Sequence, residues 1–516
     1  MASSFANDRV LNSVLAQREM SGEEAAALIQ PGNQIGMSGF TGSGYPKVVP
    51  MALARRVADA HLRGQKFKVN IFTGASTGPE LDGALAMSGA MDLRMPYQSD
   101  PITRKLINAG EIQYIDLHLS HAAQLVEYGF LGKLDLAIIE VTAILEDGRV
   151  IPSTSLGNNQ TYIECADKII LEVNSTQPME LEGLHDVYYG LGLPPFRDPI
   201  PLTSPSQRIG VPHLTIPIDK VIAVVHTDVP DRATPFKAPD ENSKRIAAHI
   251  MNFLSSEVKK GRIPPSLLPL QSGVGNIANA VLYGLEEGPF QDLTAYTEVI
   301  QDGLINLMRS GKMLSASATS FSLSPEGVAD IMPHIGEYRD RIVLRAQEIS
   351  NHPGIIRRLG VIAMNGMIEA DIYGNVNSTH IMGSSIMNGI GGSGDFARNG
   401  FVSIFMAPST AQKGSISTIV PMVSHVDHTE HDVSVVVTEQ GLADLRGLSP
   451  TQRAKLIIET CSHPDYRPAL RDYERRASKL SMGKHTPHML TESLSWHSRY
   501  LRCGHMLSQD RDSSCG

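Results

Sequence analysis

The sequence predicts an α/β protein built from two related domains with mainly parallel sheets. Short apolar runs alternate with helical patterns along the chain, at residues 69–72, 136–140, 168–172 and 221–225. Each run is continuously apolar, which is typical of strands buried on both faces of a parallel sheet. At 516 residues the chain is also too long for one ordinary hydrophobic core.

The helices and the domain boundary follow from the segments between these runs. Helical patterns occupy residues 50–61 and 101–108 of the N-terminal half, and residues 244–259 of the C-terminal half. The link at 228–243 (DVPDRATPFKAPDENS) is polar and contains proline, which is typical of a connection between domains. We therefore expect an N-terminal α/β domain at 1–230 and a C-terminal α/β domain at 231–516.

The two halves carry similar landmarks in the same order. A glycine turn at 39–44 leads through a helix to the strand 69–72, and a glycine turn at 273–275 leads through a helix to a strand at 293–300. This order indicates a duplicated α/β unit, with chance similarity of glycine and proline landmarks as the alternative. Because ligands bind beyond the carboxyl ends of parallel strands, we expect the active site in the cleft between the two domains.

Composition and charge exclude several classes of partner. Residues 1–20 lack the apolar centre of a signal peptide, and no apolar run approaches the ~20 residues of a membrane span. The net charge is -9 and no basic block stands out, which argues against nucleic acid. Cysteines are scattered, with no CxxC pair, at Cys165, Cys461, Cys503 and Cys515. We expect a cytoplasmic protein with small-molecule partners and no membrane partner.

The most informative feature is the glycine turn at 273–275, followed about twenty residues later by Glu298. Glycines let backbone N–H groups approach a ligand oxygen, and the start of the predicted helix 277–285 adds a positive dipole. A glutamate is already an anion at neutral pH, so it needs no base to act as a nucleophile. The pattern predicts acyl chemistry with Glu298 as the nucleophile and backbone amides as the oxyanion hole. A salt bridge at the end of a strand is the alternative for Glu298.

A second glycine run, at 388–394, precedes a predicted strand at 401–406. It lacks the strand-to-helix context of a dinucleotide fingerprint. It either completes a pair of amides for an oxyanion or forms a tight turn.

A third motif, at 424–432, is rich in possible metal ligands. These are His425, Asp427, His428, Glu430 and His431. Their spacing matches neither HExxH nor another common ligand arrangement, so we predict no metal site. We expect these side chains to hydrogen-bond the loop or to line a pocket.

Several long motifs resemble one family. They occur at 38–47 (SGFTGSGYPK), 73–79 (TGASTGP), 270–276 (LQSGVGN), 297–302 (TEVIQD), 350–353 (SNHP), 387–396 (MNGIGGSGDF) and 438–447 (TEQGLADLRG). On these motifs the chain resembles the class I CoA-transferases of the acetyl-CoA hydrolase/transferase family. The resemblance implies CoA thioesters and short carboxylates as substrates, no permanently bound cofactor, and a homodimer. It favours exchange between succinyl-CoA and acetate, with propionyl-CoA:succinate exchange, acetyl-CoA hydrolysis or non-catalytic CoA binding as alternatives.

The resemblance also assigns roles to individual residues. Glu298 stands where the family glutamate becomes a glutamyl-CoA thioester, and Val274 and Gly392 stand where backbone N–H groups form the oxyanion hole. Asn351 and Glu439 match polar residues near the reacting carboxylate. Positions that match CoA contacts are Gly273, Val274, Gly275, Asn276, Ile277, Ile368, Asn388 and Gly392. Gln412 replaces a CoA-binding lysine of relatives, so either the adjacent Lys413 takes over or one ionic contact is missing.

Overall fold

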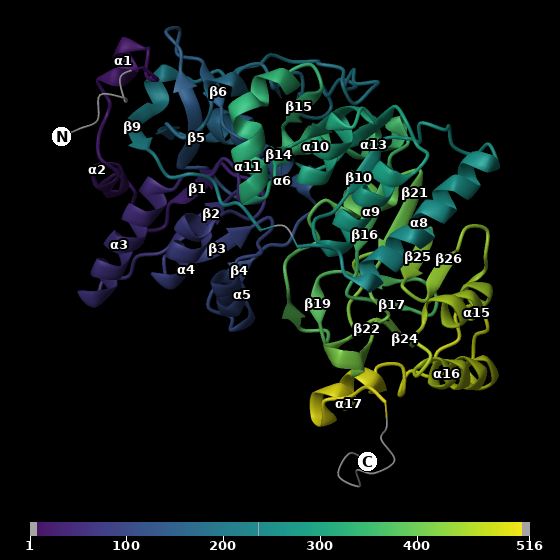
Figure 1. Ribbon diagram of the computed structural model, residues 1–516. Helices are drawn as coiled ribbons and strands as arrows, with labels where there is room; N and C mark the ends of the chain where they lie inside the picture. The colour runs from purple at the N-terminus through teal and green to yellow at the C-terminus, as the bar shows by residue number, and fades with distance from the viewer. Residues whose placement is uncertain (1–7, 236, 508–516) are drawn as a thin grey trace. The chain divides into compact units, whose positions relative to one another are not determined.

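The structure is a computed structural model that describes residues 8–235 and 237–507 (Figure 1). The chain divides into two compact units. The first unit contains the described residues up to 235, with 294–308 and 313–359; the second contains 237–293, 309–312 and 360–507. The expected division after residue 230 therefore needs a correction, because a later segment that includes Glu298 returns to the first unit.

The first unit contains a mainly parallel sheet in the order β4-β3-β2-β1-β5-β7-β9, with β6 antiparallel to β5. Its strands are β1 (Gln34–Met37), β2 (Val69–Phe72), β3 (Met91–Met95), β4 (Gln113–Tyr114), β5 (Leu136–Ile144), β6 (Val150–Pro152), β7 (Lys168–Asn174) and β9 (Val221–Thr227). Ile35 of β1 pairs with Ile71 of β2 on one side and Leu136 of β5 on the other. The strand order reverses at β1, and ligands of open α/β sheets bind beside such a reversal.

Helices cover this sheet with apolar faces. Val49, Leu53 and Val57 of α3 follow the i, i+4, i+8 spacing of one helix face and are buried in one cluster with Ile35 and Ile71. Figure 1 shows α3 and α4 beside β2 and β3. The helices that lie mainly in this unit are α1 (Ser13–Ala16), α2 (Gly22–Ala27), α3 (Val48–Leu62), α4 (Ala84–Met87), α5 (Pro101–Asn108), α6 (Leu119–Glu127), α7 (Asn159–Cys165), α10 (Asp302–Arg309), α11 (Pro325–Ile331), α12 (Gln347–Ser350) and α13 (Pro353–Leu359).

A second group of strands explains why residues after 293 belong to the first unit. Leu344 of β15 pairs in parallel with His185 of β8, a strand of the N-terminal half. β13 pairs in parallel with the other side of β15. The strands of this group are β8 (His185–Asp186), β11 (Leu293–Tyr296), β12 (Val299–Ile300), β13 (Met313–Ala318), β14 (Ser320–Phe321) and β15 (Ile342–Arg345). Pairing across the sequence halves thus joins the Glu298 segment to the first unit.

The second unit contains the parallel strands β25, β21, β16 and β10 in that order, with β26 antiparallel at the edge. They are β10 (Leu270–Ser272), β16 (Ile362–Gly366), β21 (Val402–Met406), β25 (Val435–Thr438) and β26 (Gly441–Asp444). The helices are α8 (Glu241–Lys259), α9 (Asn276–Glu287), α14 (Ser393–Asn399), α15 (Pro450–Cys461), α16 (Arg467–Leu480) and α17 (Ser495–Cys503). The short strands are β17 (Glu369–Asp371), β18 (Val376–Asn377), β19 (His380–Ile381), β20 (Ser385–Ile386), β22 (Thr410–Ala411), β23 (Ile416–Ser417) and β24 (Ile419–Val420). Phe405, Val436 and Ile458 share the core of this unit.

The prediction of an α/β fold with mainly parallel sheets is confirmed. The predicted strand 69–72 and helix 101–108 match β2 and α5. The single strand predicted at 293–300 is wrong, because it divides into β11 and β12. Thr297 N–H donates to Ser317 O, and the Glu298 carbonyl then accepts from Thr319 and Ser320, so the chain bends between two pairing partners.

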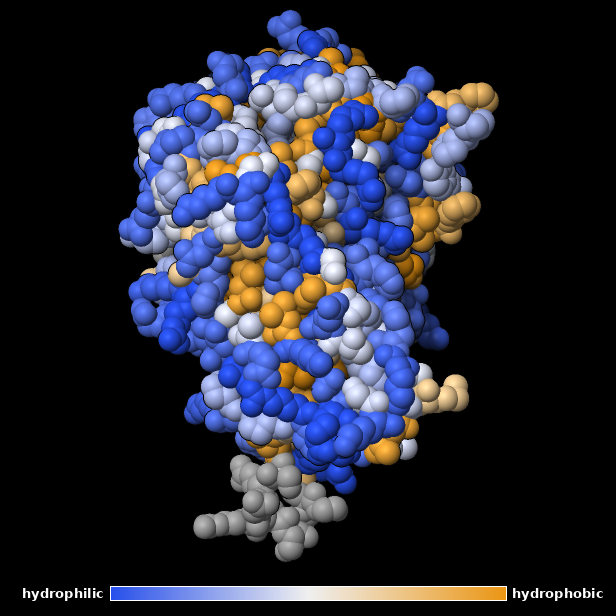
Figure 2. All heavy atoms as spheres, turned by 90° about the vertical axis from the view of Figure 1, so that its right-hand side faces the viewer, coloured by the Kyte–Doolittle hydropathy of each residue, from blue (hydrophilic) through white to orange (hydrophobic). Residues whose placement is uncertain are grey.

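No helix among residues 8–235 and 237–507 is long and apolar enough to cross a membrane. On the face drawn in Figure 2, hydrophilic residues cover most of the surface and hydrophobic residues form separate groups among them.

Candidate active site

The glycine turn at 273–275 joins β10 to α9 and lines a pocket of about 360 Å³ in the second unit. Gly366, at the end of β16, and Met406, at the end of β21, line the same pocket. The pocket therefore lies at the carboxyl ends of three neighbouring parallel strands, where α/β sheets bind ligands. Its lining residues are Asp240, Ser243, Gly273, Val274, Gly275, Asn276, Ile277, Ala278, Gly366, Met406 and Pro408.

Backbone groups give this pocket an affinity for negative charge. Gly275 precedes α9 with φ +116°, a conformation that favours glycine, and no side chain caps the helix start. The first N–H groups of α9 have no partner inside the helix, and the helix dipole is positive at that end. The start of α8 reaches the same pocket, but a carboxylate already caps it, because Asp240 accepts from Ser243 N at 2.8 Å. Asp240 was not predicted as a lining residue, because its sequence context resembles an ordinary helix cap.

The second glycine run forms a tight turn that opens α14. Gly391 has φ +58°, and Gly392 is the buried residue that precedes the helix. Ser393 closes the turn by donating from its backbone N to Ile390 O at 3.3 Å and from its hydroxyl at 2.6 Å. The run is thus a tight turn, and it also presents the amide of Gly392 at a helix start. Both predicted interpretations, a tight turn and an amide donor for an oxyanion, are compatible with this geometry.

Other predicted CoA contacts lie on loops of the same unit. Ile368 follows β16 and donates from its backbone N to Asn377 O at 2.9 Å, and Asn388 is half-buried after β20. Gln412 and Lys413 both have left-handed backbones, with φ of +48° and +56°, and both are exposed. Such strain in non-glycine residues is often retained at functional sites. The role of Lys413 as a substitute cation stays a prediction.

Glu439 is held as an ionised carboxylate at the end of β25. The residue is 7% exposed, and Ser409 donates to it from both its backbone N, at 2.7 Å, and its hydroxyl. Gln440 donates from Nε2 at 2.9 Å. Burial alone raises the pKa of Glu439, but these hydrogen bonds more than reverse that effect and lower the pKa. A carboxylate with three donors and a lowered pKa is a weak proton acceptor.

Glu298 lies in the bend between β11 and β12 of the first unit and is half-buried. Its carbonyl accepts from Thr319 N at 2.9 Å and Ser320 N at 3.3 Å. The adjacent Val299 packs with Phe40, Ala75 and Leu119 in one apolar cluster. Phe40 and Ala75 belong to the motifs at 38–47 and 73–79, so both N-terminal motifs pack beside the segment that carries Glu298.

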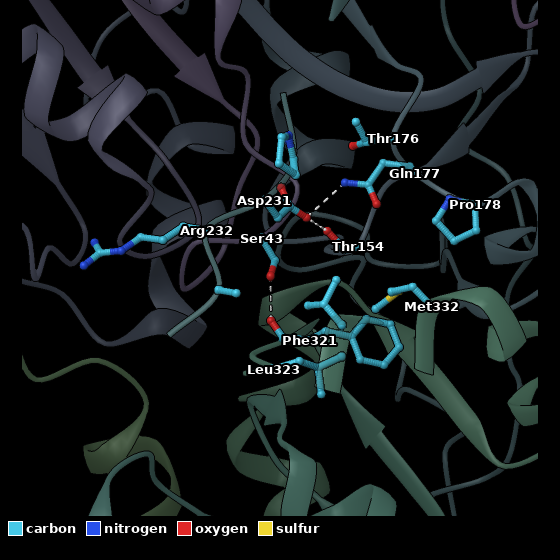
Figure 3. Close-up of a pocket in the computed structure, with 13 residues that line it drawn as sticks. Ser43, Thr154, Thr176, Gln177, Pro178, Asp231, Arg232, Phe321, Leu323 and Met332 are labelled. Atoms are coloured by element: carbon cyan, nitrogen blue, oxygen red, sulfur yellow. Dashed lines mark hydrogen bonds between the residues drawn. The ribbon is translucent and has the colours of Figure 1, made fainter. Parts of the chain in front are cut away.

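Side chains of the glycine loop at 39–44 bond to β14, the strand that pairs with β12 after Glu298. The Ser43 hydroxyl donates to Phe321 O at 2.7 Å (Figure 3), and the hydroxyls of Thr41 and Ser320 lie 3.1 Å apart. Asp231 holds the other side of the loop by accepting from Gly44 N at 3.0 Å.

Asp231 belongs to a buried charge network that the sequence did not reveal. It accepts from Lys47 Nζ at 2.8 Å and from Gln177 and Thr154, the last two drawn in Figure 3. Lys47 is fully buried and also binds the Glu140 carboxylate. Lys47 lies inside the motif at 38–47, but Asp231 lies in the polar link, whose composition is that of a simple connection.

Asn351, the second predicted residue of the first unit, ends α12. It is fully buried, and its Nδ2 donates to Gln347 O at 2.9 Å. Within the part of the chain that the structure describes, its Oδ1 has no hydrogen-bond partner. Buried polar atoms are normally satisfied, so this oxygen needs a donor from a ligand or a water molecule.

The same helix carries a buried acid, Glu348. Its side chain is 7% exposed and lies 3.3 Å from Arg197 Nη2. Burial raises the pKa of Glu348 to about 8. The negative charge of Glu127 raises the pKa further, whereas the positive charge of Arg197 lowers it. The folded protein therefore favours the protonated acid.

We expect Glu348→Gln to stabilise the protein at pH 8 and to change little at pH 4.5. A folded-state pKa raised above the unfolded value contributes stability that is present below the unfolded pKa and lost as the pH rises through the folded pKa. Removing the ionisable group removes that loss, which we expect to be roughly 4 kcal/mol at pH 8. Urea unfolding at both pH values measures the effect, with the exposed Glu111→Gln as control. Equal stability of wild type and Glu348→Gln at pH 8 would contradict the assignment.

The third motif, the histidine-rich segment at 424–432, packs against loops of the second unit. The rings of His425 and His380 are in contact, with centroids 3.8 Å apart and planes tilted by 37°. Asp427 accepts from Ser378 N at 2.7 Å and from Thr379 Oγ1 at 2.9 Å. Glu430 N donates to Asn375 at 2.9 Å. Among the described residues no group of three histidine, cysteine or acidic side chains is arranged to hold a metal ion. That no metal binds in solution stays a prediction.

Known proteins resemble this chain in sequence and in fold. Residues 7–192 match the model for the acetyl-CoA hydrolase/transferase N-terminal domain, and residues 327–474 match the model for the C-terminal domain. The succinyl-CoA:acetate CoA-transferase of Clostridium kluyveri is 51% identical, over 96% of this chain and 92% of that protein. The propanoyl-CoA:succinate CoA transferase of Escherichia coli is 45% identical, over 95% and 98%. The acetyl-CoA hydrolase of Candida glabrata is also 45% identical, over 95% of each chain.

A solved structure extends the likeness to the fold. RipA from Yersinia pestis superimposes with a TM-score of 0.69 at 23% identity, over 90% of this chain and 98% of that one. At this identity the match shows the fold alone. The family models and the near full-length relatives show more: the chain belongs to the acetyl-CoA hydrolase/transferase family.

Proposed function

We propose that this protein is a CoA-transferase that moves CoA from succinyl-CoA to acetate through a thioester on Glu298. The observations that support the proposal are a carboxylate in a strand-end bend of the first unit and glycine turns at helix starts of the second unit. The names of the relatives from Clostridium kluyveri and Escherichia coli support CoA transfer as the reaction class.

The proposed reaction proceeds in four steps. The Glu298 carboxylate attacks the thioester carbonyl of succinyl-CoA, which forms a succinyl-glutamyl anhydride and releases CoA thiolate. The thiolate attacks the glutamyl carbonyl, which releases succinate and leaves a Glu298–CoA thioester. Acetate attacks that thioester to give an acetyl-glutamyl anhydride and thiolate again. The thiolate then attacks the acetyl carbonyl, which forms acetyl-CoA and restores the Glu298 carboxylate. Both acids react as anions, so the cycle moves no proton and needs no general base.

The backbone amides have a defined part in this scheme. Each step builds negative charge on a carbonyl oxygen, and the N–H groups of Val274 and Gly392 would stabilise it. The pocket at 273–278 would bind CoA beside the start of α9, whose N–H groups carry no side-chain cap and favour its phosphates. Ile368, Asn388 and Lys413 would complete the CoA site. The Asn351 amide would be a hydrogen-bonding group close to the Glu298 carboxylate.

Hydrolysis is the main alternative, because a relative at 45% identity is an acetyl-CoA hydrolase. Water resolves a thioester efficiently only with a base that takes its proton. Glu439 is the candidate suggested by its motif, but its lone pairs accept from Ser409 and Gln440 and its pKa is lowered. This weak basicity favours transfer to a carboxylate over transfer to water.

Three wider expectations belong to the same proposal. The protein would work in the cytoplasm, as a homodimer, and without a permanently bound cofactor. The scheme supports the last of these, because its only reacting groups are the two substrates and Glu298.

The test is a competition between acceptors with succinyl-CoA as donor. Acetyl-CoA formation in millimolar acetate is expected to exceed CoA release in water alone by about 100-fold or more, a difference of roughly 3 kcal/mol in activation free energy. Release of CoA in water as fast as acetyl-CoA forms with acetate would make the protein a hydrolase. Propionate in a parallel arm ranks the acceptors, and we expect only a modest preference for acetate because one methylene contributes about 1–3 kcal/mol.

A further inference from the structure

The histidine-rich segment at 424–432 places the side chain of His428 inside the protein. His428 is 2% exposed, and its ring lies against Phe405 with centroids 4.6 Å apart. Its backbone N donates to Val376 O at 3.0 Å, which pairs the segment with β18. His428 is therefore held in place by packing and by the backbone, unlike its exposed neighbour His431.

The Nε2 atom of His428 joins two serines from different loops. It lies 3.1 Å from the Ser378 hydroxyl and 3.3 Å from the Ser393 hydroxyl. The Ser393 hydroxyl donates its hydrogen to Ile390 O at 2.6 Å, and the Ser378 hydroxyl donates to the Asp427 carboxylate at 3.3 Å. Because the Ser393 hydrogen goes to Ile390 O, the hydrogen of the His428–Ser393 bond comes from Nε2. The network thus assigns the tautomer with the proton on Nε2.

Ser393 connects this histidine to the predicted oxyanion loop. It is the first residue of α14 and follows Gly392 directly. Its two hydrogen bonds to Ile390 O close the turn that contains Gly391 and Gly392. A brace on the Ser393 hydroxyl therefore restrains the direction in which the Gly392 N–H points.

We infer that His428 is a positioning residue for CoA transfer: through Ser393 it holds the glycine turn that presents the Gly392 amide to the reacting carbonyl. This inference rests on the proposed function, since it assumes that Gly392 binds the oxyanion. Oxyanion donors act by being fixed in advance where charge develops, so a loosened donor lowers the rate of the chemical steps more than the affinity for substrate.

The test compares His428→Phe with His428→Gln. Phenylalanine retains a ring against Phe405 but has no hydrogen-bond donor, whereas glutamine places a donor near the position of Nε2. We expect His428→Phe to lower kcat about 10- to 100-fold, with the KM for acyl-CoA changed less than about 2-fold. His428→Gln is expected to recover most of kcat. The rate of Glu298 thioester formation in a single turnover should fall with kcat in the phenylalanine variant.

Further variants separate positioning from folding and from the proposed function. Ser393→Ala breaks the same brace, so it should lower kcat in a similar way and combine with His428→Phe less than additively. If His428→Phe fails to fold, Ser393→Ala alone tests whether the hydrogen bond between His428 and Ser393 supports kcat. Two results would overturn the inference. One is a wild-type kcat in folded His428→Phe. The other is that the phenylalanine and glutamine variants lose kcat to the same extent and melting temperature to the same extent. A wild-type protein that transfers no CoA would instead refute the proposed function.

Discussion

Glu298→Gln is expected to lower the kcat for CoA transfer by about 10⁴-fold or more, because it removes the nucleophile while keeping the shape of the side chain. The melting temperature should stay close to that of the wild type. Glu298 is only half-buried, and the backbone bonds that shape its bend come from its carbonyl and from Thr297 N. The assay is acetyl-CoA formation from succinyl-CoA and acetate.

The exposed Glu326→Gln is a matched control, because it removes a carboxylate of the same unit from the first turn of α11. It should retain full activity. Glu298→Gln with more than about a tenth of wild-type turnover would contradict the assignment of the nucleophile, since covalent catalysis by this residue leaves no alternative route of similar rate.

Lys47→Met is expected to destabilise the protein by about 3–5 kcal/mol, because it leaves two carboxylates without their cation in the interior. Lys47 Nζ binds Glu140, lies 2.8 Å from Asp231 and donates to Tyr45 O at 2.7 Å, and its side chain is fully buried. Burial alone lowers the pKa of Lys47, but the two carboxylates more than reverse this and raise the pKa. The free energy of urea unfolding measures the loss.

The control for Lys47→Met is Lys68→Met, which breaks a surface pair with Asp92 at 3.5 Å, where both side chains are about half exposed. A surface pair contributes about 0–1 kcal/mol, so this variant should have near wild-type stability. The double variant Lys47→Met/Glu140→Gln should recover part of the loss, because it removes one unpaired charge. A loss below about 1 kcal/mol for Lys47→Met would show that the network contributes no more than a surface pair.

The fold class and the glycine turn could be predicted because local sequence determines them. The continuous apolar run at 69–72 becomes the buried strand β2, and the glycine at 275 occupies a backbone conformation that favours glycine. The bend at Glu298 could not be predicted, because it depends on a change of pairing partner from β13 to β14. Residues 293–300 are apolar enough for one strand, and only tertiary pairing divides them.

The domain division and the supporting residues also depend on tertiary structure. The pairing of β15 with β8 carries residues after 313 into the first unit, and no local pattern in either strand indicates that partner. Asp231 lies in a polar link, and it holds the glycine loop by accepting from Gly44 N and Lys47 Nζ. Both residues stand more than 180 positions earlier in the sequence. His428 was noted among possible metal ligands, whereas its ring nitrogen bonds two serines that are distant in sequence.

Trapping of the covalent intermediate tests the central claim most directly. The protein is incubated with succinyl-CoA, treated with borohydride and digested, and the peptide that contains Glu298 is examined by mass spectrometry. We expect inactivation that depends on succinyl-CoA, with Glu298 reduced to the corresponding alcohol, and neither change in Glu298→Gln. Complete inactivation with an unmodified Glu298 peptide would contradict the account.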